Sequence, residues 1–186
     1  MNNVKTNFKM FLWMSLLTGV LYPLLLTGIG YLLMPHKSGG SFLTSEGKII
    51  GSTLIGQKFE SEKYFWGRPS SSGYNPLPSE GSNLGPTSAL LKQQVSQREA
   101  FLLKAHGLPE GAWIPRELLF ASGSGLDPHI SPHTAHFQIE RILKARGLDP
   151  KATRSQVEKL VKEFTYKNSY TNVLELNLAL DKVLRQ

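Results

Sequence analysis

One short segment, ASGSGLDPHISP at 121–132, holds the three groups of a hydrolytic triad: the hydroxyl of Ser124, the carboxylate of Asp127 and the imidazole of His129. In such a triad the base lies between the nucleophile and the acid, and the three usually come from separate elements. The Gly-x-Ser-x-Gly nucleophile elbow is absent, because residue 122 is Ser. We therefore favour a constrained turn that leads into a helix, with an enzyme that uses these three residues as the alternative.

Three histidines, His129, His133 and His136, have the spacing of one face of a continuous helix, which resembles a zinc site. However, Ser131 and Pro132 are typical of a helix N-cap and a first helical residue, so His129 precedes the helix. No acidic ligand lies on the same face. We expect solvated or locally hydrogen-bonded histidines and no bound metal.

Two glycine-bearing segments, 51–57 and 122–125, could turn backbone N–H groups toward a phosphate. Neither ends in the Gly-Lys-Ser/Thr of a P-loop, whose lysine holds the β- and γ-phosphates and whose hydroxyl binds Mg²⁺. Nucleotide hydrolysis by this chain is therefore not expected, whereas a weak or shared nucleotide contact stays open. The chain also has no cysteine, which excludes a thiol nucleophile, a disulfide framework and a Cys-ligated zinc.

The formal net charge of +7 comes partly from the N-terminal end, because residues 1–37 carry three lysines and no acid. The remaining excess is small, and the chain has no Lys/Arg run and no basic stripe interleaved with aromatics. Such features mark nucleic-acid-binding surfaces, so no nucleic-acid partner is expected.

Residues 11–34 form a run of 24 residues without a charge, long enough to cross a hydrocarbon core of about 30 Å as a helix. The run is longer than the apolar part of a cleaved signal peptide, and Pro35 follows it where a small-x-small cleavage site would stand. Lys5 and Lys9 precede it, and positive charge favours the cytoplasmic side. We predict a single-pass protein of the cell (inner) membrane, with a cytoplasmic N-terminus and an extracytoplasmic domain.

This run divides the chain into a short tail at 1–10, the transmembrane helix at 11–34, a linker at 35–47 and one soluble domain at 48–186. Pro23 lies in mid-span, where it predicts a kink in the transmembrane helix. The domain combines helix and strand signals without an internal repeat. The expected fold class is therefore α/β in the broad sense (α+β), with one transmembrane helix in front of it.

The strand signals of the domain come from periodicity and from β-branched or aromatic residues. The stretch 48–57 and the triplet 64–66 predict strands. The tail 174–180 alternates leucine with polar or small residues, which is a strand period, before a short C-terminal helix. Residues 69–87 are dense in Ser, Gly, Pro and Asn, which predicts a flexible loop that becomes ordered on a partner.

Three helices of the domain are predicted from their end signals. The first runs from Pro86 to about Ala105. The second starts at the Ser131 cap and ends before Gly147, and the third opens at 153–156 with the capping box Thr-x-x-Gln. The residues expected on the buried faces of the last two helices are Ala135, Ile139, Ile142, Leu143, Val157, Leu160, Val161 and Phe164.

Five segments, in the same order along the chain, resemble the KdpC family, the third and smaller of the large chains of Kdp-type potassium-transporting ATPases. They are GSTLIGQ-x-F at 51–59, YFWGRPSS at 64–71, GSNLGPT at 81–87, SGSGLDPHIS at 122–131 and NVLELNLALD at 172–181. Two loops depart from the family pattern: Glu80 stands where a second glycine is usual, and 166–171 replaces a Gly-Glu-Pro-Arg-like turn.

The resemblance implies a non-catalytic subunit of a high-affinity, ATP-driven potassium uptake complex. Its implied partners are a channel-like potassium-translocating subunit, a P-type subunit that hydrolyses ATP, and a very small membrane peptide. The family is described as a catalytic chaperone that raises the ATP affinity of the hydrolytic subunit, so ATP would be shared and no cofactor bound by this chain alone. Potassium is the ion that such a complex transports.

By analogy with transporter signature loops, the resemblance makes Gln57 the candidate ATP contact. An extracytoplasmic domain cannot reach cytoplasmic ATP, however, so an effect on ATP affinity would then have to be transmitted through the partners. The other residues of the family segments are expected to shape loops or contact the partners. They are Gly56, Phe59, Arg68, Pro69, Asn83, Gly85, Pro86, Ser122, Gly123, Ser124, Gly125, Asp127, Pro128 and His129.

Overall fold

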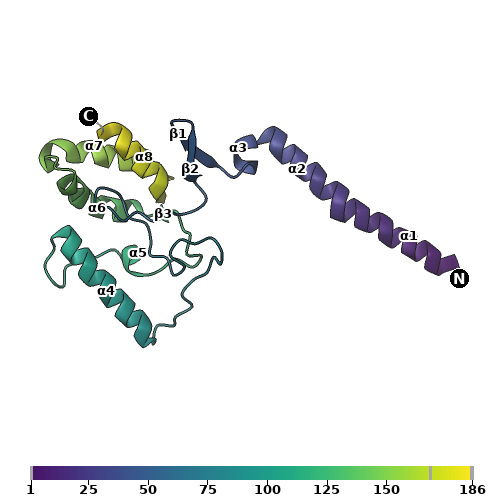
Figure 1. Ribbon diagram of the computed structural model, residues 1–186, viewed down its shortest axis with the longest axis horizontal. Helices are drawn as coiled ribbons and strands as arrows, with labels where there is room; N and C mark the ends of the chain where they lie inside the picture. The colour runs from purple at the N-terminus through teal and green to yellow at the C-terminus, as the bar shows by residue number, and fades with distance from the viewer. Residues whose placement is uncertain (1, 168, 185–186) are drawn as a thin grey trace. The chain divides into compact units, whose positions relative to one another are not determined.

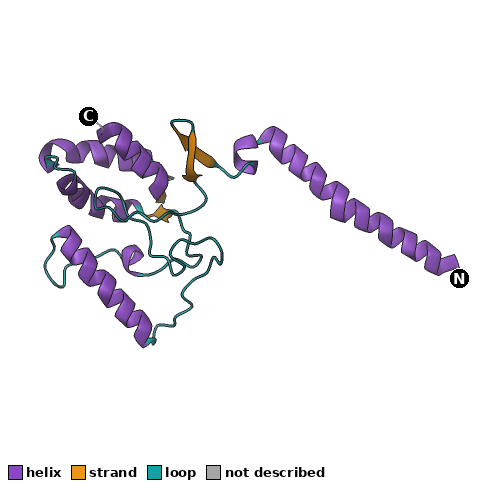
Figure 2. Cartoon of the chain, viewed as in Figure 1, coloured by secondary structure: helices purple, strands orange, loops and turns teal. Residues whose placement is uncertain are grey.

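The computed structural model describes residues 2–167 and 169–184. The chain divides into two compact units, Met1–Ile50 and Gly51–Gln186 (Figure 1). The first unit is a long helix followed by a hairpin, and the second is a body of helices with a small sheet (Figure 2). The prediction of an apolar helix joined to an α+β domain is confirmed at this level.

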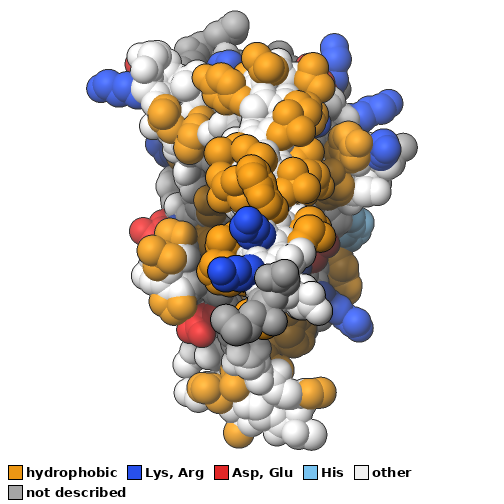
Figure 3. Space-filling model, turned by 90° about the vertical axis from the view of Figure 1, so that its right-hand side faces the viewer, with side chains coloured by type: hydrophobic (Ala, Val, Ile, Leu, Met, Phe, Trp, Pro, Cys, Tyr) orange, Lys and Arg blue, Asp and Glu red, His pale blue; other side chains and the backbone are white. Residues whose placement is uncertain are grey.

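The first unit begins with a helical run built from α1 (Asn2–Leu16), a π-helical turn η1 (Leu17–Leu21) and α2 (Tyr22–Leu33). Residues Asn3–Leu33 of this run are long and apolar enough to cross a membrane, and none of their apolar window is buried. Hydrophobic side chains gather over the face of the molecule shown in Figure 3. A helix that is apolar all round and unburied is typical of a segment whose solvent is lipid.

The π-helical turn lies directly before Pro23, the second residue of α2. A proline inside a helix lacks an N–H and its ring collides with the carbonyl four residues earlier, here that of Gly19. Widening the preceding turn to π geometry relieves this collision, and prolines and π-bulges are established causes of helix distortion.

The first unit ends in a short helix α3 (Pro35–Ser38) and a hairpin of β1 (Phe42–Ser45) and β2 (Lys48–Ser52). The hairpin turn Glu46-Gly47 has positive φ at both residues, as two-residue hairpin turns require. The strand predicted at 48–57 is correct only as far as Ser52, and residues 53–57 turn away from it. The predicted linker 35–47 thus contains regular structure.

The second unit contains five helices and three short strands. In chain order they are α4 (Ala89–His106), α5 (Arg116–Leu119), β3 (His129–Ile130), α6 (Pro132–Ala145), α7 (Pro150–Glu163), β4 (Thr165–Tyr166), β5 (Tyr170–Asn172) and α8 (Val173–Leu184). The strands form an antiparallel sheet in the order β3-β5-β4. Helix α6 packs against α7, and α7 packs against α8.

Helix α6 has the ends that its sequence predicts. The Ser131 hydroxyl accepts a hydrogen bond from the Thr134 N–H at 3.2 Å, Pro132 is the first helical residue, and Gly147 has φ +69°. Its four predicted core residues are all 0% exposed. Full burial of one such aliphatic side chain stabilises the fold by about 1.5–3 kcal/mol.

The starts of two other helices differ from the prediction. Helix α4 starts at Ala89 because the Ser88 hydroxyl caps it, three residues beyond the predicted Pro86. Helix α7 starts at Pro150, where the Asp149 carboxylate accepts from the Lys151 N–H at 3.0 Å, so Thr153 lies in its first turn and forms no capping box. The predicted core residues of α7 are nevertheless buried, or partly buried in the case of Phe164; the fully buried ones are Val157, Leu160 and Val161.

The strand predicted at 174–180 is helix α8. The Asn172 side-chain oxygen accepts from the N–H groups of Leu174 and Glu175, at 3.1 and 3.2 Å, which satisfies the first donors of the helix. Most of α8 is buried, including leucines on more than one side, so its every-other-residue leucines reflect a helix that is apolar nearly all round.

The triplet 64–66 is extended, as predicted, but it pairs with no strand. Phe65 belongs to a core cluster built with α6, α7 and α8, whereas Trp66 belongs to a second cluster with Leu102, Ile114 and Leu118. Adjacent side chains therefore point to opposite sides, as in a strand. Side-chain amides take the place of the missing neighbouring strand.

Candidate functional site

Two buried amide side chains bind the backbone of 65–66. Asn177 of α8 accepts from the Phe65 N–H at 2.8 Å and donates to the Phe65 carbonyl at 3.0 Å. Gln138 of α6 bonds to both backbone groups of Trp66 in the same way, at 2.8 and 3.1 Å. Because each amide offers a donor and an acceptor, the pair reproduces the hydrogen bonds of a β ladder inside the core.

Arg141 extends this network. Its guanidinium donates to the carbonyls of Glu62 and Tyr64 and to the Gln138 side-chain oxygen, and it lies 3.7 Å from the centre of the Trp66 ring. Arg141 is 3% exposed, and burial lowers its pKa to about 9, although the Glu62 carboxylate partly offsets this.

The Nε of Arg141 donates to Nε2 of His106 at 3.3 Å, so that imidazole nitrogen must be unprotonated. Burial, and secondly the Arg141 charge, lower the pKa of His106 from 6.5 to about 4. As the pH falls through this range, the unfolded chain binds a proton at His106 that the folded chain does not. The contribution to stability is therefore complete above pH 6.5 and is lost progressively toward pH 4.

We predict that His106→Gln weakens this pH dependence, because glutamine can still accept from Arg141 but does not titrate. The measurement is urea unfolding of the full chain in detergent at a series of pH values from 7.5 to 4. The midpoint of the variant should fall less steeply than that of the unaltered chain between pH 6.5 and 4. Parallel slopes for the two proteins would contradict the prediction.

The family segments 64–71 and 122–131 meet at an ion pair. Arg68 Nη1 donates to Asp127 Oδ2 at 3.1 Å, and Arg68 Nη2 donates to the Ala121 carbonyl at 3.4 Å. The other carboxylate oxygen of Asp127 accepts from the backbone N–H of His129 at 3.0 Å. Asp127 therefore connects the start of β3 to the loop that follows the 64–66 segment.

Tyr74 and Gly56 pack against the same carboxylate-bearing turn. The Tyr74 hydroxyl donates to the Arg68 carbonyl at 2.5 Å, and burial, with the Asp127 charge second, raises the pKa of Tyr74 to about 12. The Gly56 N–H donates to the Leu126 carbonyl at 2.7 Å. A Cβ on Gly56 would lie only 2.6 Å from the Asp127 carbonyl oxygen, so only glycine fits this approach.

The segment 69–87 contains no helix or strand, as predicted, and several of its residues contact 122–125. The Pro69 carbonyl accepts from the Ser122 N–H at 3.0 Å, and the Ser79 hydroxyl donates to the Ser124 carbonyl at 2.7 Å. A Cβ on Gly81 would lie 2.7 Å from the Gly123 carbonyl oxygen, and Gly125 has φ +71° with Glu80 equally close. The predicted flexibility of the segment stays a prediction.

The remaining family residues hold turns and element ends. Asn83 has φ +51°, the Gly85 carbonyl accepts from the Ser88 N–H at 3.0 Å, and Pro86 follows directly. The Pro128 carbonyl accepts from the Val173 N–H at 2.9 Å at the start of α8. Phe59 packs against both core clusters. The structure thus brings the five family segments together as one scaffold around the 122–131 turn.

The three groups of the suggested triad do not form one. The Ser124 hydroxyl accepts from the Leu126 N–H at 3.1 Å, which is a local turn bond, and no bond joins it to His129 among residues 2–167 and 169–184. His129 Nδ1 lies 3.6 Å from Asp127 Oδ1 and its ring contacts Tyr170 edge-on. A nucleophile within hydrogen-bonding reach of its base is what such chemistry requires.

The three histidines have separate surroundings. His129 contacts Tyr170, His133 contacts the Trp113 ring at 4.8 Å, and His136 lies at a surface hollow beside α7. Over the described residues no group of three or more potential metal ligands converges.

Gln57, the candidate ATP contact, folds back on its own segment. A Cβ on Gly51 would collide with Gln57 Nε2 and would lie 2.8 Å from a Leu174 methyl group, so the amide occupies the space beside that glycine. The neighbouring cavity of about 420 Å³, lined by Lys58 and Phe59 among others, does not include Gln57 in its wall.

Sequence reasoning does not identify Gln138, Asn177, Arg141 or Tyr74 as scaffold residues. A signal is present for the first and third, since both lie on the apolar side of α6 between fully buried residues. A polar residue on a buried face must find a hydrogen-bond partner, and that requirement could have drawn attention to them.

Comparison with known proteins agrees with the resemblance of the five segments. A family model described as K+-transporting ATPase, c chain (KdpC) matches residues 4–182. A protein of Cereibacter sphaeroides named "Potassium-transporting ATPase KdpC subunit" is 45% identical over 184 residues, which cover 97% of both chains. Proteins of that name from Leptospira interrogans and Serratia proteamaculans are each 43% identical and are covered over 94% and 98% of their own lengths. The chain belongs to the KdpC family of K+-transporting ATPases.

Proposed function

We propose that this chain is the KdpC component of a high-affinity, ATP-driven potassium uptake complex, in which it supports assembly and performs no catalytic step of its own. The observation that carries this proposal is the family match from residue 4 to residue 182. Its partners are a channel-like potassium-translocating subunit, a P-type ATP-hydrolysing subunit and a small membrane peptide. The residues of the family segments support such a role, since they bond mainly to one another and build a scaffold.

In this proposal the helix Asn3–Leu33 crosses the cell (inner) membrane once, with the second unit outside. Lys5 and Lys9 near its N-terminus favour a cytoplasmic start. Burial of apolar helix surface in lipid, together with complete intrahelical hydrogen bonding, makes such a segment stable across the bilayer.

The test is labelling of intact cells with a membrane-impermeant maleimide, which is clean because the chain has no cysteine. A cysteine at Leu77, which is 83% exposed, should react in intact cells. A cysteine at Asn3, the matched control, should react only after permeabilisation. Labelling of Asn3 and protection of Leu77 in intact cells would reverse the proposed orientation.

We further propose that any effect on the ATP affinity of the hydrolytic subunit is transmitted through the partners. A domain outside the cell cannot contact cytoplasmic ATP, so the effect must be a coupling free energy between distant sites. The folded-back side chain of Gln57 supports this view, because its amide lies against Gly51 and Leu174.

Gln57→Ala is therefore expected to leave the apparent KM for ATP of the assembled complex within about twofold of the unaltered value. The measurement is potassium-stimulated ATPase activity of the purified complex over a range of ATP concentrations. Lys58→Ala, an exposed neighbour, serves as the control for general effects of the segment. A KM raised about tenfold or more by Gln57→Ala alone would support direct contact.

A further inference from the structure

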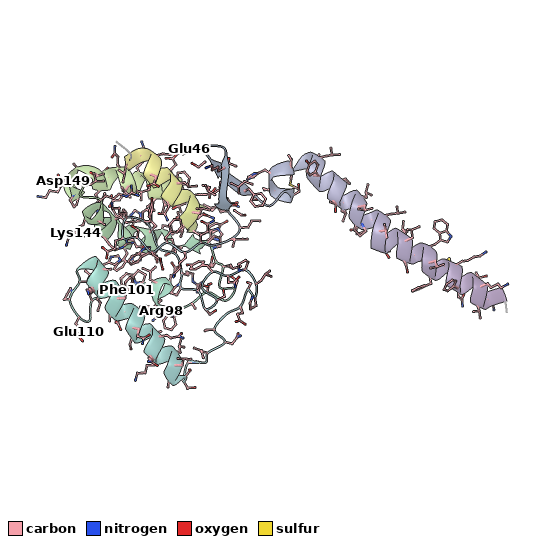
Figure 4. The ribbon with its side chains drawn as sticks, viewed as in Figure 1. Glu46, Arg98, Phe101, Glu110, Lys144 and Asp149 are labelled. Atoms are coloured by element: carbon pink, nitrogen blue, oxygen red, sulfur yellow. The ribbon has the colours of Figure 1, made fainter. Side chains whose placement is uncertain are left out.

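Phe101 of α4 is 57% exposed at a place where three adjoining hollows meet. Its ring stacks on Trp66 with ring centres 5.3 Å apart, and the hollows have volumes of about 420, 540 and 270 Å³. Arg98 and Phe101 lie on the side of α4 that faces the rest of the second unit (Figure 4). We call this region the Phe101 surface and define it by the walls of the three hollows.

Helix α4 is packed on little of its length. Of its 18 residues only Leu102 is buried, while Leu90 and Phe101 are both more than half exposed. Helices in proteins gain most of their stability from packing an apolar face, so an 18-residue helix with one buried side chain has packing surface left for a partner.

The Phe101 surface is strongly positive. Its walls carry two carboxylates, Glu60 and Glu62, and six cationic side chains: Lys58, Arg68, Arg98, Lys104, Arg141 and Lys144. Lys58 is paired with Glu60, and Arg68 is paired with Asp127. Within the described part of the chain, Arg98, Lys104 and Lys144 form no ion pair.

Two of these charges have a local explanation. Lys104 and Lys144 lie in the last turns of α4 and α6, where a cation interacts favourably with the helix dipole. Arg98 lies in mid-helix and has no such reason. Its guanidinium is held in place by donation to the Leu119 carbonyl at 2.8 Å, and partial burial lowers its pKa. A desolvated cation without a counter-charge is costly until an anion pairs with it.

We propose that the Phe101 surface docks a peptide segment of another subunit that carries an apolar side chain beside a carboxylate. The apolar side chain fills the 420 Å³ hollow between Phe59, Leu102 and Leu118, and the carboxylate pairs with Arg98. Gln94 and Gln97 on the next turns of α4 are available to bond to the peptide backbone. The inference rests on the proposed function, since the partner is another member of the same complex.

The experiment uses the full chain, co-expressed with the other subunits of its transporter, with p-benzoylphenylalanine at position 101. On illumination it should crosslink to a partner segment that contains Asp or Glu next to apolar residues, as mapped by mass spectrometry. The same photoreactive residue at Tyr166, which is 53% exposed on β4, is the control and should not capture that segment.

Arg98→Glu should then lower the amount of chain retained by the tagged complex about tenfold, because a like charge would face the carboxylate of the partner. Changing that carboxylate to lysine in the partner should restore retention. Lys151→Glu, an exposed charge reversal on α7, should leave retention unchanged.

The proposal is overturned if position 101 crosslinks only to lipid, or to a segment without a carboxylate, while the chain still copurifies with the complex. It is also overturned if Arg98→Glu is retained as well as the unaltered chain. In either case the proposed function stands, because copurification is intact. A chain that never copurifies with the other subunits overturns the proposed function and this inference together.

Discussion

Gln138→Leu is expected to lower the free energy of unfolding by about 2–5 kcal/mol, although leucine has nearly the same size and is more apolar. The Gln138 side chain is 0% exposed and bonds to both backbone groups of Trp66 and to Arg141. Leucine would leave the Trp66 N–H and carbonyl buried without those partners. Each buried group that loses its partner costs about 1–3 kcal/mol, which gives the expected range.

The measurement is urea unfolding of the full chain in detergent, followed by tryptophan fluorescence, with Gln93→Leu as the matched control. Gln93 is exposed on α4, so the same change of chemistry there removes no buried hydrogen bond and should shift the midpoint by little. Equal midpoints for the two variants would show that Trp66 finds other partners and that Gln138 is not part of the scaffold.

The bonds of Gln138 also explain why the strand predicted at 64–66 joins no sheet. The aromatic triplet has strand periodicity, and the structure confirms that Phe65 and Trp66 point into different clusters. What a local pattern cannot contain is the identity of the hydrogen-bond partner. Here the partners are amides 72 and 112 residues further along the chain, so an extended segment is satisfied without a ladder.

The helices show which features sequence reasoning can place. The start and core face of α6 depend on Ser131, Pro132 and a 3.6-residue period, all of which are local, and both predictions are confirmed. Helix α8 is missed because it is buried on most of its sides, which removes the amphipathic signal. The Asn172 side chain that begins it is visible in the sequence, but its role as a cap becomes clear only from the structure.

The candidate site shows the same division. The family segments are recognisable from their residues, and the chain belongs to the family that they resemble. Their convergence on the 122–131 turn could not be inferred, because Arg68–Asp127 and Ser79–Ser124 join residues 59 and 45 positions apart. The Phe101 surface has no motif at all, since it arises from side chains of separate segments that meet only after folding.

Gly56→Ala is expected to destabilise the second unit by about 3 kcal/mol, through overpacking against backbone. The added methyl group would lie 2.6 Å from the Asp127 carbonyl oxygen and 3.1 Å from the Tyr74 ring. A flexible side chain could move aside, but the Asp127 backbone is fixed by the Arg68 ion pair and by the turn bond to His129. The 2.7 Å bond from Gly56 N–H to the Leu126 carbonyl would therefore have to lengthen or break.

Gly85→Ala is the matched control, since both glycines belong to family segments but for different reasons. A Cβ on Gly85 would meet no atom within 4 Å and its φ is not positive, so alanine there should be neutral or stabilising by about 0.4–1 kcal/mol. Urea unfolding of the three full chains in detergent compares them directly. If Gly56→Ala unfolds at the same urea concentration as Gly85→Ala, the turn at 126–127 adjusts freely and the family segments do not form the rigid scaffold inferred from their contacts.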